Sequence, residues 1–93
     1  MSNRKKILEQ WKLHTPKDEV KDTVIAVIEY YFSGKYNQSG TSHIMIKDKR
    51  LQEHGVTDIA GVLTIPISGG QKVKGVYLKK LVKAIETITG EIL

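Results

Sequence analysis

The sequence predicts a small α+β domain with two layers, in which helices pack on one face of a three-stranded antiparallel sheet. Two patterns lead to this prediction. Apolar residues recur every three or four positions toward both ends of the chain, and they alternate with polar residues in two short segments between them. With 93 residues and no cysteine, the chain is long enough to bury one core without disulfide bonds. Packing helices against one sheet face covers both kinds of apolar surface.

Two helices are predicted in the first third of the chain. Residues 4–13 place Ile7, Leu8 and Trp11 on one face, and His14 ends this helix. Thr15 followed by Pro16 is typical of a helix start with threonine as the N-cap, so a second helix is expected from there to Gly34. The apolar stripe of the second helix consists of Val20, Val24, Val27, Ile28 and Tyr31.

Three short strands are predicted in the middle of the chain. Residues 35–39 are expected to form the first, joined by a turn at residues 39–42 to a second strand at residues 43–47. Alternation places Ile44 and Ile46 toward the helices and leaves His43, Met45 and Lys47 on the open face. A connection with one helical turn around Leu51 leads to the third strand, residues 62–67, where Pro66 indicates an edge or a strand end. Its inward side chains are Leu63, Ile65 and Ile67.

A final helix is predicted after the glycine-rich turn at residues 68–70. Gly75 precedes this helix and Gly90 is placed to close it. Its apolar stripe consists of Leu78, Leu81, Val82, Ile85 and Ile88.

The charge distribution favours an anionic partner such as a nucleic acid or an acidic protein. The net charge is +5 and the sequence pI is about 9.5. Residues 71–85 contain five lysines and no acid, so the basic field is concentrated toward the C-terminal end: Lys72, Lys74, Lys79, Lys80 and Lys83. The sequence shows no metal-binding spacing, no nucleotide-binding glycine loop and no long apolar run. We therefore expect a cytoplasmic protein that uses neither a metal nor another cofactor and does not enter a membrane.

His43 is the residue with the clearest capacity for acid–base chemistry. It follows a polar turn and begins a predicted strand, so its imidazole is held by a rigid backbone and stays accessible. Imidazole has an ordinary pKa of about 6.5, which lets it accept or donate a proton near neutrality. The other two histidines, His14 and His54, are interpreted as ordinary residues at helix ends.

Together these segments resemble the HicA family of toxin–antitoxin systems, small mRNA interferases with a fold like that of double-stranded-RNA-binding domains. The resemblance covers Lys17 to Ile88. The anchors are Gly40, Ser42 and His43 before an apolar strand, the strand segment 63–67, and Gly75 leading into a helix with Leu81 and Ile85. Residues 1–15 then form an N-terminal helical extension, and residues 16–93 form the HicA-like domain.

The resemblance implies a site and partners. It makes His43 the catalytic histidine, with Gly40 and Ser42 shaping the turn before it. It implies cleavage of mRNA without a cofactor, a HicB-type antitoxin protein as partner, and RNA contacts from Lys79, Lys80 and Lys83. Independently of the resemblance, Lys72 and Lys74 beside the paired glycines are expected to bind a backbone phosphate. The chain differs from the family pattern in Thr41, which stands between the glycine and the serine, and in residues 68–70, which replace a histidine common after the proline.

Two functions remain open from the sequence. One is a metal-independent endoribonuclease in which His43 acts as general base or general acid, while a lysine, a tyrosine, water or a second protomer takes the other role. The other is a non-catalytic module of the same fold that binds RNA or a protein, in which the lysines supply salt-dependent affinity.

Overall fold

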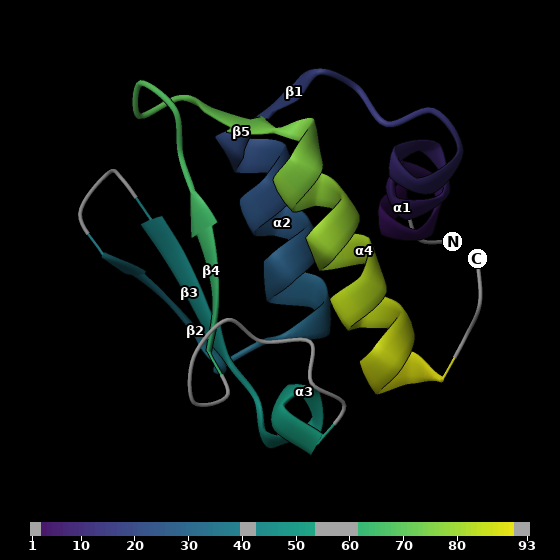
Figure 1. The fold of residues 1–93 in the computed structure, drawn as a ribbon, viewed down its shortest axis with the longest axis vertical. Helices are drawn as coiled ribbons and strands as arrows, with labels where there is room; N and C mark the ends of the chain where they lie inside the picture. The colour runs from purple at the N-terminus through teal and green to yellow at the C-terminus, as the bar shows by residue number, and fades with distance from the viewer. Residues whose placement is uncertain (1–2, 40–42, 54–61, 91–93) are drawn as a thin grey trace.

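The computed structural model describes residues 3–39, 43–53 and 62–90 and shows a small α+β domain (Figure 1). Four helices and five strands are present in these ranges, and the strands form one three-stranded and one two-stranded antiparallel sheet. In chain order the elements are α1 (Asn3–Leu13), β1 (Asp18–Val20), α2 (Lys21–Tyr31), β2 (Tyr36–Ser39), β3 (His43–Lys47), α3 (Lys49–Glu53), β4 (Val62–Pro66), β5 (Lys72–Lys74) and α4 (Gly75–Thr89).

The three-stranded sheet has the order β2-β3-β4, and helices α2 and α4 lie on one side of it (Figure 1). The register pairs Ile44 with Ile65 and Ile46 with Leu63. All four side chains are buried, because alternation along the strands turns them toward the helices. The three predicted strands and the face that they bury are therefore confirmed, and Pro66 ends the edge strand β4 as expected.

The helix stripes complete a single hydrophobic core. Val24, Val27 and Ile28 of α2 are buried, as are four of the five residues predicted for α4: Leu78, Leu81, Val82 and Ile85. Ile88 is half-buried, and Gly90 caps α4 in the left-handed conformation, with a φ of 72°. The predicted course of the last helix is confirmed.

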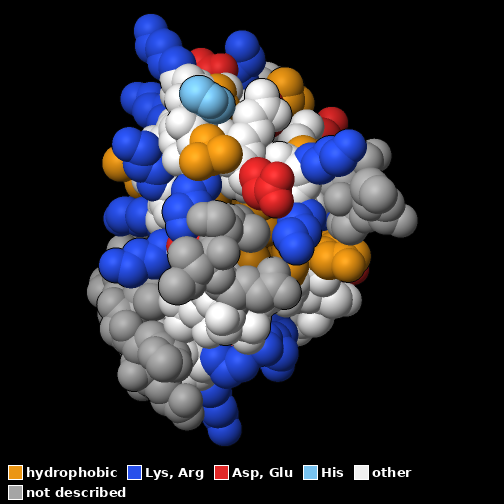
Figure 2. Space-filling view, turned by 90° about the vertical axis from the view of Figure 1, so that its right-hand side faces the viewer, with side chains coloured by type: hydrophobic (Ala, Val, Ile, Leu, Met, Phe, Trp, Pro, Cys, Tyr) orange, Lys and Arg blue, Asp and Glu red, His pale blue; other side chains and the backbone are white. Residues whose placement is uncertain are grey.

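Helix α1 packs into the same core and is not a separate unit. Leu8 and Trp11 are buried in the cluster that contains the α2 and α4 stripes. The Trp11 indole N–H donates to Oε1 of Glu19 at 3.2 Å, and Lys12 pairs with Glu86 of α4 at 2.5 Å. Lys and Arg side chains are numerous on the face of the molecule that α1 occupies (Figure 2).

The predicted start of the second helix is wrong. Thr15 does not cap a helix: its hydroxyl donates to the carbonyl oxygen of Trp11, so it closes α1 instead. Residues 18–20 form β1, which pairs with β5 in the register Asp18 to Lys74 and Val20 to Lys72. Pairing with a distant segment thus outweighs the local capping signal, and α2 begins only at Lys21.

Two details at the ends of α2 also differ from the prediction. Val20 is not part of the apolar stripe, since it precedes the helix and remains 47% exposed. At the other end the buried Phe32 caps the helix, and its backbone N–H donates to the carbonyl oxygen of Ile28. Gly34 follows in the left-handed conformation, at a φ of 74°, so it turns the chain toward β2 after the helix has ended.

Asp48 fixes the start of the predicted helical turn, which is α3. Its carboxylate accepts the Arg50 backbone N–H at 2.9 Å and the Arg50 side chain at 3.0 and 2.6 Å. Asp48 is only 5% exposed. The hydrogen bonds from the Arg50 side chain are the main cause that lowers the pKa of Asp48 below its ordinary value of 3.8.

This lowered pKa predicts a pH dependence of stability. A carboxyl group with a lower pKa in the folded state stabilises the fold above its unfolded-state pKa, and that contribution is lost as the pH falls through the folded-state value. Asp48→Asn keeps the side chain size but removes the titration. We expect the urea midpoint of the parent to fall more steeply below about pH 4 than that of the variant. Parallel pH dependence of the two midpoints would contradict this role of Asp48.

Candidate functional site

His43 lies at the start of β3, on the face of the three-stranded sheet that points away from the helices. Its backbone pairs with Ser39 of β2 and with Pro66 of β4, so strands on both sides hold it. The side chain is exposed, whereas its neighbour Ile44 is buried against the helices. The expectation of an exposed imidazole at the start of a strand is therefore confirmed.

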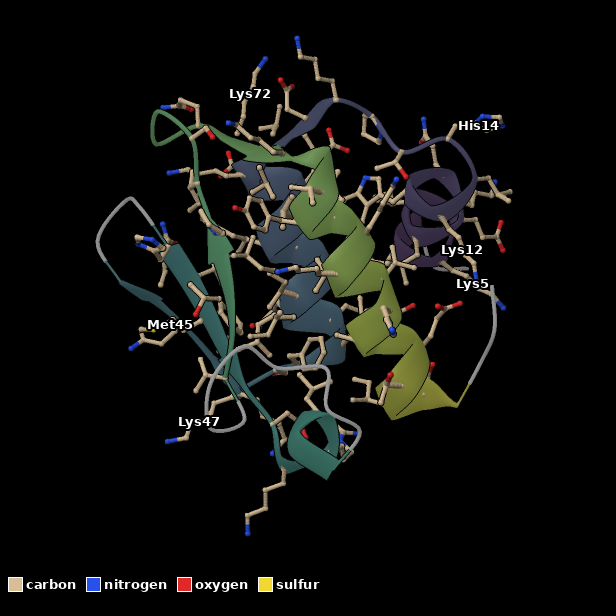
Figure 3. All side chains as sticks on the ribbon, viewed as in Figure 1. Lys5, Lys12, His14, Met45, Lys47 and Lys72 are labelled. Atoms are coloured by element: carbon tan, nitrogen blue, oxygen red, sulfur yellow. The ribbon has the colours of Figure 1, made fainter. Side chains whose placement is uncertain are left out.

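The same outer face carries two further cations that the sequence-based site did not include. Met45 and Lys47 point outward from β3, away from α2 and α4 (Figure 3). The backbone N–H of Lys47 donates to the carbonyl oxygen of Lys35, which places Lys35 beside Lys47, and Asn37 pairs with Met45. The described side chains of this outer face include no acid: Lys35, Asn37, His43, Met45, Lys47, Val62, Thr64 and Pro66.

A hollow of about 440 Å³ opens at one end of the outer face. Residues 34–37, Met45, Lys47 and Val62 line it. Its volume lies in the range of about 300–1,000 Å³ that is usual for small-molecule sites. Met45 and Val62 contribute apolar surface, while Lys35, Asn37 and Lys47 contribute polar groups. The combination can accept a flat, partly apolar ligand that carries negative charge.

Two acids, Asp48 and Glu29, interact with residues that line this hollow. Asp48 binds Arg50, as described above. Glu29 accepts a hydrogen bond from the Tyr36 hydroxyl, and this bond is the main cause that raises the pKa of Tyr36. The Arg50 guanidinium offsets most of the charge of Asp48, although Asp48 also interacts electrostatically with Lys35. The Tyr36 hydroxyl is neutral, so it leaves the charge of Glu29 in place.

The lysines predicted from the sequence lie elsewhere. Lys74 and Lys79 line a hollow of about 320 Å³ beside the segment that joins α1 to β1. Lys79 also lines a second hollow, of about 270 Å³, together with Lys12 and Lys83. Lys80 lies over the Tyr77 ring at 5.7 Å from its centroid. Lys72 pairs with Asp18 at 3.6 Å, across the β1–β5 ladder.

The structure thus distributes the predicted site residues over two surfaces. Lys79 and Lys83 line one hollow with Lys12 of α1, and Lys79 lines the other with Lys74. Lys12 lies on the side of α4 away from the sheet, whereas Met45 and Lys47 point outward from the sheet (Figure 3). His43 lies on that outer face, where Lys35 and Lys47 are the described cations. Cross-strand register, which no single segment reveals, brings these two lysines together.

Gly40 and Ser42, predicted to shape the turn before His43, lie outside the described residues, as does His54. Among the residues that are described, no three or more histidines, cysteines or acids gather where they could bind one metal ion. None of the described helices has the length and apolar character needed to cross a bilayer.

Comparison of the chain with protein-family models, with curated proteins and with solved structures gives no match. The functional argument therefore depends on the geometry of the outer face and on the chemistry of its residues.

Proposed function

We propose that this protein is a HicA-like endoribonuclease with a fold like that of double-stranded-RNA-binding domains, which cleaves single-stranded RNA on the outer face of the sheet. The observation that carries the proposal is the exposed imidazole of His43, held between two strands on a face with two lysines and no described acid. The succession of α2, three antiparallel strands and α4 supports the fold assignment.

The chemistry of this proposal requires no cofactor. With His43 as general base, the imidazole takes the proton of a ribose 2′-hydroxyl, and the 2′-oxygen attacks the adjacent phosphorus. The bond from phosphorus to the 5′-oxygen breaks, and that oxygen takes a proton from a second group. The products are a 2′,3′-cyclic phosphate and a 5′-hydroxyl. Lys35 and Lys47 bind phosphates of the same strand and keep it on the face.

One observation favours the alternative, a non-catalytic RNA-binding or protein-binding module. Lys79 and Lys83 line one hollow with Lys12, and Lys79 lines a second with Lys74, whereas none of these lysines lines the hollow of the outer face. In such a module these lysines supply the affinity for an anionic partner, and His43 has no part in it.

Under the nuclease proposal, a HicB-type antitoxin would inhibit RNA cleavage by covering the outer face of the sheet.

The proposal is tested by incubating the purified protein with single-stranded RNA in the presence of a metal chelator. We expect cleavage that the chelator does not abolish, and fragments that end in a cyclic phosphate. RNA binding without cleavage would favour the module. Cleavage that stops on chelation would contradict a mechanism based on His43 without a metal.

A further inference from the structure

We propose that the hollow of the outer face, lined by Lys35, Asn37, Met45, Lys47 and Val62, binds one nucleotide of single-stranded RNA and so selects the sequence presented to His43. This inference rests on the proposed ribonuclease function and names a part of its substrate site. The hollow is larger than the two beside α4, at about 440 Å³ against about 320 and 270 Å³.

The lining matches the parts of a nucleotide. Met45 and Val62, both half-buried, offer apolar surface for the face of a base, and a thioether adapts well to an aromatic ring. The amide of Asn37 carries both donors and an acceptor, so it can form hydrogen bonds with a base edge. Lys35 and Lys47 are exposed and can reach the flanking phosphates.

The hollow lies close enough to His43 to act with it. Met45 and His43 are two positions apart on β3 and point to the same side, so their α-carbons are separated by about 7 Å. A nucleotide with its base in the hollow therefore places the neighbouring ribose and phosphate next to the imidazole. The identity of the bound base then determines which phosphodiester bond lies next to His43 and is cleaved.

The ligand is a single strand because a base can enter the hollow only when it is splayed out from its neighbours. In a duplex the base edges are paired and the faces are stacked, and the protein contacts mainly the backbone. The hollow offers both apolar surface and an amide, which a duplex backbone would leave unused.

The two methionines of the chain, Met1 and Met45, give a simple reporter. The experiment uses His43→Ala protein labelled with 13C-methyl methionine, so that bound RNA is not cleaved. The NMR signal of Met45 is assigned with Met45→Leu. This signal is then followed while a short single-stranded RNA is added. We expect saturable movement of that signal. Asn37→Ala and Lys47→Ala are expected to raise the Kd about ten-fold, while Lys5→Ala, an exposed lysine on α1, changes it less than about two-fold.

The outcomes separate this inference from the proposed function. If the parent cleaves RNA but bound RNA leaves the Met45 signal in place, the hollow is not a nucleotide site and the nuclease stands. If the Met45 signal moves but the parent does not cleave, the nucleotide site stands and the nuclease falls. Equal effects of Lys47→Ala and Lys5→Ala on the Kd would also overturn the assignment, because binding would then follow total charge.

Discussion

Replacing Trp11 with alanine is expected to lower the free energy of unfolding by about 3–5 kcal/mol. The indole is 1% exposed and packs, with Leu8, in the cluster formed by α2, α4 and the sheet. The change leaves a cavity and removes the indole N–H that donates a hydrogen bond to Oε1 of Glu19 at 3.2 Å. Because small domains are stable by only about 5–15 kcal/mol, the loss is a large fraction of the total. Urea unfolding followed by circular dichroism measures it.

The matched control is Leu13→Ala, two residues further along α1. Leu13 is 71% exposed, so its removal is expected to change the stability by no more than about 0.5 kcal/mol. If Trp11→Ala and Leu13→Ala gave similar unfolding midpoints, α1 would not be part of the core. The packing of residues 3–13 against α2 and α4 would then be contradicted.

The elements that could be predicted from the sequence are those with a local period. In β3, alternation alone assigns Ile44 and Ile46 to the core and His43 to the open face, and the structure has the same assignment. In α4, the spacing of Leu78 and Leu81 was enough to define the buried side. Both patterns are local, so no knowledge of distant partners was needed.

The elements that could not be predicted depend on contacts between distant residues. Strands β1 and β5 have three residues each, and Val73 is the only one of the six that is buried. Such short segments lack a period, and they become strands because they pair with each other. Lys35 was missed at the site for the same reason, since only the β2–β3 register places it beside Lys47.

Replacing His43 with alanine is expected to reduce the rate constant of RNA cleavage by about 100- to 10,000-fold, the usual contribution of a positioned acid or base. The side chain is exposed, so its removal leaves no cavity in the core. RNA affinity should persist, because the proposed phosphate and base contacts come from Lys35, Asn37 and Lys47. The control is His14→Ala, which removes an exposed histidine at the end of α1.

The most direct measurement is the single-turnover rate of RNA cleavage at saturating protein, with chelator present, for the parent, His43→Ala and His14→Ala. Saturation removes differences in binding, so the rates compare the chemical step alone. We expect His14→Ala to cleave at the parent rate and His43→Ala to be slower by at least about 100-fold. A His43→Ala rate equal to that of the parent would show that the imidazole transfers no proton in the reaction.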